Sequence, residues 1–508
     1  MSAQAGIVFS IIVYLAIMIA VGIYFSKKET STAEGFYLGG RKLGPLVAAM
    51  SAEASDMSSY LLMGLPGLAY LSGIADVGWT VVGLAVGTYL NWLLVARRLR
   101  RYSSACGAIT IPDFFSKRFH DSKNILACIA AIVILVFFIP YTASGFKAIG
   151  TLFSTLFGVD YHMAMLLGAL FVVCYTVLGG FLAVSTTDLI QSIVMTIALI
   201  IMVFFGINVA GGWGAVMQNA QALPGYMSMT QTYDYVGGTA APYGPITIVS
   251  TLAWGLGYFG MPHILLRFMA IRDENEIKVS RRIASVWVVI SMVIAIMIGI
   301  IGYSASVAGK IPMFNSSSDS ETVIIQFSNL LAQHGFLAAV VAGVVLAGIL
   351  ACTMSTADSQ LLTAASGVSQ NLVHDFMKIK LTEKMSMLIA RGTILAIALI
   401  GVFLAWNPDS SVFTIVSFAW AGFGGAFGPV MLFALFWKRM NFQGALAGML
   451  SGGVMVFVWK YLVRPMGGAW NIYELLPAFL VGCVAIVVVS LLTKAPSEDI
   501  VKEFEAAK

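Results

Sequence analysis

Apolar windows of about 20 residues recur along the whole chain, and they constrain its fold more than any other feature. A helix needs about 20 apolar residues to cross the hydrocarbon core of a bilayer. The sequence therefore predicts an all-α polytopic membrane protein with thirteen transmembrane helices. We place these spans at residues 6–26, 45–70, 76–96, 124–154, 161–181, 187–208, 246–269, 283–308, 337–368, 388–406, 411–436, 442–462 and 474–493.

The composition supports this fold class. Of the 508 residues, 59% are hydrophobic and 10% are charged, and the mean hydropathy is +0.90. Soluble proteins carry about 25% charged residues, so the composition excludes a soluble enzyme, a disordered chain and a nucleic-acid binder. No polar block long enough to fold in water interrupts the spans. We therefore expect residues 1–508 to form one domain.

Lys and Arg residues are distributed unevenly between the two sets of loops. With thirteen spans, one set runs from Lys27 and Lys28 to Lys508 and holds all of the 29 Lys and Arg residues except Lys147, Lys310, Lys460 and Arg464. Positive residues favour cytoplasmic loops, which predicts an external N-terminus and a short cytoplasmic tail at 494–508. We expect Lys147 to lie near the outer surface with its charged end in water.

Two spans have sequences that are unfavourable for a continuous helix. The second contains Glu53 and Asp56 at membrane depth, and the seventh has three glycines and a proline within residues 255–262. Such breaks persist in a membrane only where protein or a water-filled cavity surrounds them. A break at the start of each half of the chain is typical of inverted-repeat transporters with a central binding site. The alternative is a packing kink or an interface of small residues between helices.

Four motifs resemble the sodium/solute symporter family, in particular its members that carry proline. The motifs are residues 54–59 (ASDMSS), 254–271 (WGLGYFGMPHILLRFMAI), 354–356 (MST) followed by 360–362 (QLL), and 437–448 (WKRMNFQGALAG). The resemblance covers nearly the whole chain. It implies a LeuT-like core of five plus five inverted-repeat helices, at 45–208 and 246–436. The first helix at 6–26 and two C-terminal helices at 442–493 lie outside this core.

Ser355 and Thr356 are adjacent hydroxyls in the ninth span, and the carbonyl of Cys352 lies one turn earlier. Sodium, like other hard cations, prefers several oxygen ligands. The alternative is that these hydroxyls bond to carbonyls of their own helix. The resemblance implies that both bind sodium, together with the carbonyls of Ala54, Met57 and Cys352, where the family usually has alanine in place of the cysteine.

The resemblance also assigns roles to other polar residues. Asp56 is expected to act in sodium coupling, chiefly by organising the site, because a carboxylate within a membrane is a candidate functional group. Ser58 matches a hydroxyl of the same region. Asp188, Asp358 and Ser359 match a second cation site of some family members, although an aspartate here replaces one hydroxyl. A proton site or a solvated inner cavity remain alternatives.

For the substrate, the resemblance implies contacts from Tyr141, Trp254, Tyr258 and Pro262. Trp254 and Tyr258 are four residues apart and could face one cavity. Aromatic residues in membrane helices also serve in packing or at the interface. A zwitterion such as proline could be held by exposed amides and broken-helix ends without an arginine.

Four further residues flank this expected site. The resemblance gives Arg41 and Gly64 roles in gating or at the inner mouth. His263 and Arg267 follow the break in the seventh span, and we expect them to anchor the inner interface.

The function that the resemblance implies is sodium-coupled uptake of L-proline by alternating access across a bacterial cytoplasmic membrane. A family member for pantothenate or another amino acid is the nearest alternative. The sequence contains no P-loop pattern, no pore-lining repeat and no reactive constellation of its five histidines, so we expect neither an enzyme nor a cofactor. The expected partners are proline, sodium and the lipid bilayer, with no nucleic acid and no obligatory protein partner.

Overall fold

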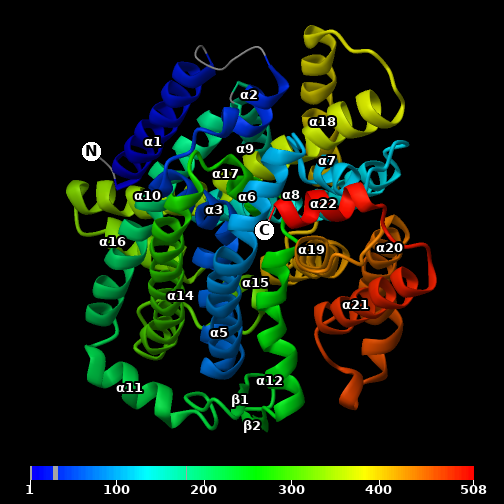
Figure 1. Cartoon of the computed structure of the whole chain (residues 1–508). Helices are drawn as coiled ribbons and strands as arrows, with labels where there is room; N and C mark the ends of the chain where they lie inside the picture. The colour runs from blue at the N-terminus through cyan, green and yellow to red at the C-terminus, as the bar shows by residue number, and fades with distance from the viewer. Residues whose placement is uncertain (1–2, 27–31, 179, 508) are drawn as a thin grey trace.

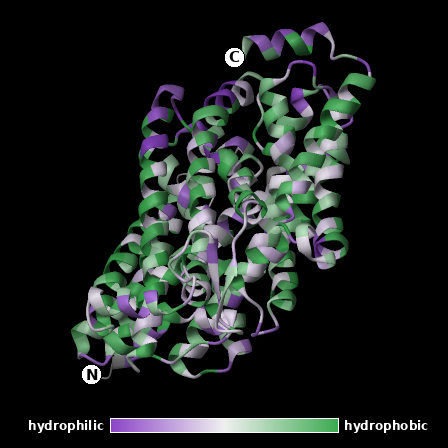
Figure 2. Cartoon of the chain, turned by 90° about the horizontal axis from the view of Figure 1, so that it is seen from below, coloured by the Kyte–Doolittle hydropathy of each residue, from purple (hydrophilic) through white to green (hydrophobic). Residues whose placement is uncertain are grey.

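The computed structural model describes residues 3–26, 32–178 and 180–507, and these residues are almost entirely helical (Figure 1). Their two strands, β1 (Gln231–Asp234) and β2 (Thr239–Pro242), pair as an antiparallel hairpin. Within the described part of the chain, ten helices are long and apolar enough to cross a membrane. Figure 2 shows hydrophobic residues along these long helices. This is the architecture of a multi-pass membrane protein.

Helical residues occupy each of the thirteen predicted windows. In chain order the helices are α1 (Ala3–Ser26), α3 (Pro45–Ser59) with η2 (Tyr60–Gly64) and α4 (Leu65–Ser72), α5 (Ile74–Leu90) with η3 (Asn91–Val95) and α6 (Ala96–Ala105), α8 (Ile125–Phe157), α9 (Tyr161–Leu178), α10 (Phe181–Val209), α12 (Pro245–Leu252) with η4 (Ala253–Phe259) and α13 (Pro262–Ala270), α14 (Ile277–Val307), α17 (Phe336–Ser366) with η6 (Gly367–Phe376), α18 (Glu383–Leu404), α19 (Val412–Phe436), α20 (Phe442–Val458) with η7 (Trp459–Val463), and α21 (Leu475–Leu492). The ten long helices fall in ten of these windows, and the second, fifth and seventh windows are broken or shorter.

Several short helices lie between the predicted windows. They are α2 (Ala33–Leu38), η1 (Gly39–Arg41), α7 (Ile111–Arg118), α11 (Trp213–Ala222), η5 (Glu274–Glu276), α15 (Ser317–Ser320), α16 (Val323–Ala332), η8 (Arg464–Met466), η9 (Gly468–Trp470) and α22 (Glu498–Ala506). The predicted tail is therefore partly helical, because it contains α22, in which Phe504 is buried.

The second and seventh windows are both broken, as the sequence predicts. In the second, Ser58 adopts φ 49° and ψ −170°, and a single wide turn, η2, follows it. In the seventh, α12 tightens into the 3₁₀ turns of η4, and Met261 is extended before Pro262 begins α13. Each break lies among buried side chains, which is where lipid-shielded irregular backbone is tolerated.

Close helix packing brings both breaks against α19, which contacts η2 of the first break and η4 of the second. α17 packs against α1, α3, α8 and α10, while α19 packs against α8, η4, α20 and α21. Glycines allow the closest approach: a Cβ added to Gly87 of α5 would lie 2.4 Å from the carbonyl oxygen of Gly255 in η4. Small residues at such crossings bring backbones together in membranes.

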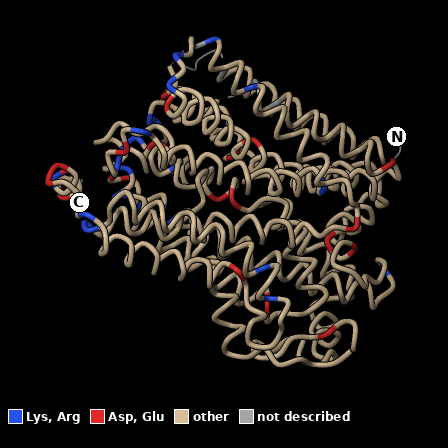
Figure 3. The backbone as a smooth tube through the Cα atoms, turned by 90° about the vertical axis from the view of Figure 1, so that its right-hand side faces the viewer, with Lys and Arg blue, Asp and Glu red and all other residues tan. Residues whose placement is uncertain are grey.

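The basic residues gather at one end of the molecule. Figure 3 shows most Lys and Arg residues toward the end where the C-terminus lies, with the N-terminus at the opposite end. This end includes the four arginines of α6, at positions 97, 98, 100 and 101. Lys27, Lys28 and Lys508 belong to the same predicted set but lie outside the described residues.

Candidate functional site

The broken helix α3 and the long helix α17 meet through polar atoms. The Ser355 hydroxyl donates to the carbonyl of Ala54 at 2.9 Å and lies 3.3 Å from that of Cys352. The Thr356 hydroxyl donates to the Cys352 carbonyl at 3.1 Å. All four residues are buried. The hydroxyls thus bond to their own helix, as in the alternative above, but Ser355 also reaches across to α3.

Cys352 and Met57 contribute different atoms. The Cys352 thiol points back along α17 and donates to the Ile349 carbonyl at 3.2 Å, so only its backbone faces the junction. The Met57 carbonyl accepts the amide of Tyr60, while its side chain lines a neighbouring cavity. The structure therefore brings together Ala54, Cys352, Ser355 and Thr356, with Met57 one turn away.

A small polar cavity lies against this junction. It is lined by Ser58, Ser59, Tyr141, Thr142, Ser144, Gly145, Thr353, Thr356, Ala357 and Gln360. Three helices, α3, α8 and α17, supply these residues. The volume is about 10 Å³, close to the least that holds one water. Most of the lining residues carry a hydroxyl or amide group, and the oxygens of such groups suit a small hard cation.

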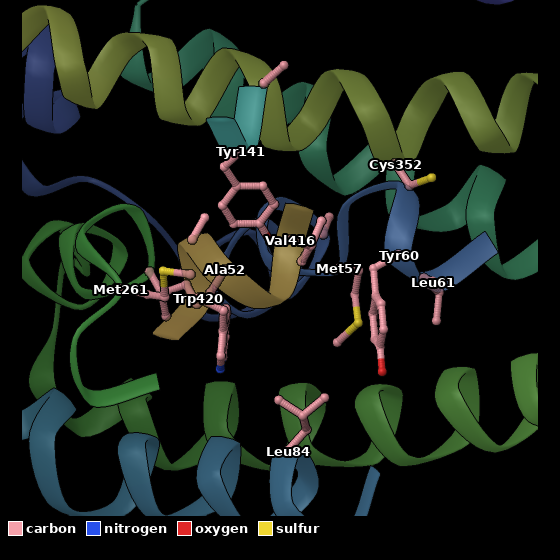
Figure 4. Close-up of a cluster of buried hydrophobic side chains, with 14 of the residues drawn as sticks. Ala52, Met57, Tyr60, Leu61, Leu84, Tyr141, Met261, Cys352, Val416 and Trp420 are labelled. Carbon is pink, nitrogen blue, oxygen red and sulfur yellow. The ribbon is translucent and has the colours of Figure 1, made fainter. Parts of the chain in front are cut away.

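A second small cavity, on the other side of Tyr141, has an aromatic wall. Its lining residues are Asp56, Met57, Tyr60, Leu84, Tyr141, Trp254, Met292, Val416 and Trp420, and its volume is about 10 Å³. Figure 4 shows Tyr60, Tyr141 and Trp420 reaching this region from η2, α8 and α19. Because one water nearly fills this space, a larger ligand can enter only if the rings separate.

Trp254 holds the aromatic wall together. Its ring stacks on Tyr60 at 5.9 Å and on Tyr473 at 5.0 Å between centroids. The indole N–H of Trp420 donates to the Trp254 carbonyl at 2.8 Å, which satisfies a backbone group freed by the break. These contacts join η2, η4 and α19 around one cavity. Offset and tilted ring pairs of this kind add specificity to apolar burial.

Asp56 connects the two breaks. The Tyr258 hydroxyl donates to its carboxylate at 2.6 Å, and the Tyr141 hydroxyl donates to its carbonyl at 3.2 Å. The other carboxylate oxygen has no hydrogen-bond partner among the described residues. Tyr258 therefore orients Asp56 and does not line the aromatic cavity. Pro262 is also absent from the lining, and it begins the buried helix α13.

Arg41 and Gly64 lie on opposite sides of the site. Arg41 donates to the carbonyls of Met269 at 2.9 Å and Ala108 at 2.6 Å, which joins η1 to α13 and to the segment before α7. Burial lowers the pKa of its guanidinium, and the charge of Arg100 lowers it further. Gly64 instead packs against Phe413 in the first turn of α19. The two residues therefore contact different elements of the fold.

The guanidinium of Arg267 lies between Asp188 and Ser359, two of the residues expected at a second cation site. Arg267 donates to Asp188 at 3.1 Å, to Ser359 at 2.5 Å and to Ser51 at 3.0 Å. Ser51 also donates to Asp188 at 2.6 Å. The carboxylate of Asp358 is buried and has no hydrogen-bond partner in the described part of the chain.

Three residues that were expected at a membrane interface are buried instead. Arg267 is 1% exposed, and His263 is fully buried, so neither anchors an interface. Lys147 is also fully buried, and its ammonium lies 3.6 Å from the Glu321 carboxylate. That carboxylate additionally accepts the amides of Val412 and Phe413 at the start of α19. A buried carboxylate stabilises each of the two cations that would otherwise need water, Asp188 for Arg267 and Glu321 for Lys147. The two ring nitrogens of His263 have no hydrogen-bond partner among the described residues.

The sequence did not identify Tyr60, Trp420 or the pairing of Arg267 with Asp188. Tyr60 directly follows Ser59, the last residue of the second-span motif, and this adjacency is a usable signal. Trp420 precedes a glycine-rich stretch in α19, and Gly424 lies against Gly257 of η4. That glycine pattern indicated close packing but not which helix would pack there.

Comparisons with known proteins agree with this arrangement. A sequence model of the sodium:solute symporter family matches residues 36–452. The osmoregulated proline transporter OpuE of Bacillus subtilis (strain 168) is 40% identical over 493 residues, which cover 97% of this chain and 96% of the relative. The sodium/proline symporter of Staphylococcus aureus (strain USA300 / TCH1516) is 38% identical, over 96% of this chain and 92% of the relative.

Two solved transporters share the fold. A Na⁺-coupled sialic acid symporter in a substrate-bound, outward-open state superposes with a TM-score of 0.79 at 19% identity, over 97% of this chain and 99% of the other. The nucleobase-cation-symport-1 family transporter Mhp1, in a closed conformation, superposes with a TM-score of 0.57 at 16% identity, over 93% and 99%. The extent of the family match and the identity to these relatives establish that the chain belongs to the sodium:solute symporter family.

Proposed function

We propose that this protein uses a sodium gradient to carry L-proline into a bacterial cell by alternating access. Two relatives that align over nearly the whole chain bear the names of proline transporters. The observation that carries the proposal is the junction of α3 and α17. There, hydroxyl and carbonyl oxygens from two helices meet beside a cavity walled by aromatic rings.

Sodium binds at this junction. The ligands are the hydroxyls of Ser355 and Thr356 and the carbonyls of Ala54, Met57 and Cys352. Such an all-oxygen set suits a hard cation. Asp56 and Ser58 couple the ion to the break in α3. The Tyr258 hydroxyl holds Asp56 in place, so the carboxylate supports the site electrostatically from one side.

Proline binds in the aromatic cavity. Trp254 and Tyr141 cover its apolar ring, and Tyr60 and Trp420 complete the wall. Tyr258 and Pro262 shape the pocket from behind. Backbone groups released at the two breaks pair with the ammonium and the carboxylate, as broken helix ends do in other transporters. The rings must separate for entry because the cavity is about 10 Å³.

The transport cycle depends on thermodynamic coupling between sodium binding and proline binding. External sodium orders α3 against α17, which completes the proline pocket, and the loaded protein then opens inward. Coupling requires only that sodium bind the proline-competent state more tightly. Arg41 closes the cytoplasmic side by joining η1, α13 and the segment before α7. Gly64 lets η2 pack on α19 on the other side.

One sodium ion per cycle suffices, because the guanidinium of Arg267 occupies the second cation position. It pairs with Asp188 and Ser359, and Asp358 lies nearby. A Hill coefficient for sodium near one, in wild type and in Asp358→Ser, is expected. A coefficient near two in wild type that falls to one in the variant would overturn this assignment.

The whole chain forms one transporter domain with thirteen spans, an external N-terminus and a cytoplasmic C-terminus. Residues 45–208 and 246–436 are the inverted repeats, each beginning with a broken helix. Residues 6–26 and 442–493 are peripheral, and 494–508 is the cytoplasmic end. The gathering of Lys and Arg residues near the C-terminus supports this orientation. Labelling of single cysteines placed in the loops of intact cells tests it.

The decisive experiment measures labelled proline uptake by proteoliposomes with and without an inward sodium gradient. Ser355→Ala and Thr356→Ala should each lower the apparent sodium affinity by about tenfold, because hydrogen-bond-like contacts to a charge are worth about 1.5–3 kcal/mol. Ser366→Ala is the matched control, since its hydroxyl also bonds within α17 but lies away from α3. Uptake that is unchanged when sodium is removed would refute the proposal.

Pantothenate or another amino acid remains the second candidate substrate. Competition separates these substrates, because unlabelled proline should suppress uptake of the label far more strongly than pantothenate or other amino acids. Stronger suppression by another solute would reassign the substrate and leave sodium coupling intact.

A further inference from the structure

The C-terminal helix α22 docks on the basic end of the molecule. Phe504 is 3% exposed, and its ring centroid lies 5.0 Å from the guanidinium carbon of Arg118. Tyr102 and Phe119 lie against the same guanidinium at 5.3 Å and 4.9 Å. Arg118 is fully buried, so α22 supplies the third ring of an aromatic cage around a desolvated cation.

Arg118 belongs to α7 and also contacts the end of α19. Its Nε donates to the Ala434 carbonyl at 2.9 Å, while Arg98 of α6 donates to the next carbonyl, that of Leu435, at 2.8 Å. The last carbonyls of a helix lack partners within the helix and attract cations. The unit formed by α6 and α7 therefore caps the last turn of α19.

One hydrogen bond and one ion pair at the rim place α22 across this contact. Glu503 lies 2.9 Å from His120, which follows α7, and Glu505 lies 3.8 Å from Lys438, which follows α19. Helix α22 thus contacts the segment that follows α7 and the segment that follows α19. Figure 3 shows this C-terminal helix at the outer end of the molecule, where the basic residues gather. Its acidic residues also disfavour the alternative of a helix lying on an anionic membrane surface.

We propose that α22 is an autoinhibitory clamp that the ionic strength of the cytoplasm releases. Inward opening requires one half of the transporter to move against the other, and a docked α22 holds α7 on the end of α19. The rim pairs are 41% to 64% exposed at their side chains. Salt screens such exposed pairs, so a rise in internal salt favours undocking and faster cycling. This inference rests on the proposed transport function.

A cavity beneath α22 provides a direct reporter of docking. It has a volume of about 500 Å³ and is walled by Tyr102, Cys106 and Lys117 on one side and by Glu503 and Ala506 of α22 on the other. Cys106 is partly buried there. Undocking of α22 removes one wall, so alkylation of Cys106 from the cytoplasmic side reports release without any dependence on transport.

The test uses the full chain in proteoliposomes at low and high internal potassium chloride, with osmolality matched by sucrose. The wild type should show about threefold faster sodium-driven proline uptake and faster Cys106 alkylation at high salt, as expected when salt weakens exposed contacts to two carboxylates. The double variant Glu503→Gln/Glu505→Gln should be fast at both salt levels. Phe504→Ala should resemble it, and Lys502→Gln, on the exposed face of α22, should behave as wild type.

Two results would overturn the clamp. Equal Cys106 alkylation in all variants at both salt levels would show that α22 does not undock. Faster alkylation with unchanged uptake would show that undocking does not limit the cycle. A chain that carries no proline under any condition would refute the proposed function instead, while Cys106 alkylation would still measure docking.

Discussion

Ser58 is the residue at which the first broken helix changes direction. A residue other than glycine with φ 49° and ψ −170° is strained by about 1–3 kcal/mol. Its hydroxyl accepts the amide of Tyr60 at 3.2 Å, which offsets part of this strain. The Tyr60 amide also donates to the Met57 carbonyl, and the Asp56 carbonyl accepts the Tyr141 hydroxyl. The strained conformation of Ser58 thereby interrupts the helical hydrogen bonding between the two small cavities.

Substitutions of Cys352 and Ser355 separate the contribution of a backbone carbonyl to sodium binding from that of a side-chain hydroxyl. The thiol of Cys352 faces away from the junction, so Cys352→Ala should change the apparent sodium affinity by less than about twofold, well under the 1.4 kcal/mol of a tenfold change. Ser355→Ala removes a hydroxyl from the junction and should cost about tenfold. Sodium titration of proline uptake compares the two. A larger loss in Cys352→Ala would show that the thiol is a ligand.

The ion pair of Asp188 and Arg267 predicts that substitutions of these two residues have strongly coupled effects on the free energy of unfolding. Asp188→Asn leaves a buried guanidinium without its anion, which costs about 3–5 kcal/mol, and should lower the melting temperature of the purified protein markedly. In Asp188→Asn/Arg267→Gln neither charge remains, so part of the stability should return. Thermal unfolding in detergent measures the double-mutant cycle. Additive losses would mean that the two residues stabilise the protein independently.

At the scale of elements, the crossing of α5 and η4 positions the aromatic wall. A Cβ on Gly87 would meet the backbone of Gly255 at 2.4 Å, and a Cβ on Gly255 would meet the Gly83 carbonyl at 2.2 Å. Because backbone atoms cannot rotate away, Gly87→Ala must push η4 and Trp254 from their positions. Overpacking of this kind costs about 1–3 kcal/mol.

We therefore expect Gly87→Ala to weaken proline binding more than sodium binding. The control is Gly453→Ala in α20, where the added Cβ finds its nearest neighbour at 3.6 Å, an ordinary contact. Equilibrium binding of labelled proline at saturating sodium makes the comparison. Equal proline affinity in the two variants would show that the crossing of α5 and η4 does not shape the pocket.

Helices and helix breaks were predictable from the sequence where residues close together in the chain determine them. The apolar windows located the long helices, and the glycines and proline of residues 255–262 located the break in the seventh span. The break at Ser58 had only an indirect signal, because serine reaches this conformation only when tertiary contacts hold it there. The short helix α22 was missed because a single buried aromatic residue defines its apolar face.

The contacts that define the site were less predictable, because they join residues far apart in the chain. The motif resemblance predicted that Ala54, Cys352, Ser355 and Thr356 lie close together, and the structure has them in contact. No periodicity shows that Trp254 stacks on Tyr60, or that Arg267 rather than water meets Asp188. Burial of Lys147 depended on Glu321, whose position in the turn after α15 has no signal in a hydropathy pattern.

At the scale of the whole molecule, the closed cavities imply that ligand binding moves the broken helices relative to the rest. Each of the two cavities has room for about one water, far less than proline needs. The residues that must part belong to α3, η2, η4 and α19. By contrast, α20 and α21 pack on each other and on α19 and line neither cavity.

Hydrogen–deuterium exchange should therefore respond to ligands unevenly. Backbone amides at residues 56–64 and 253–261 lie where helical hydrogen bonding is interrupted, so they should open readily in the free protein. Sodium alone should slow exchange at residues 56–64, and sodium with proline should slow it at both segments. Amides of α20 and α21 serve as an internal control and should not change. Proline that protects residues 253–261 fully without sodium would remove the thermodynamic link on which coupled transport depends.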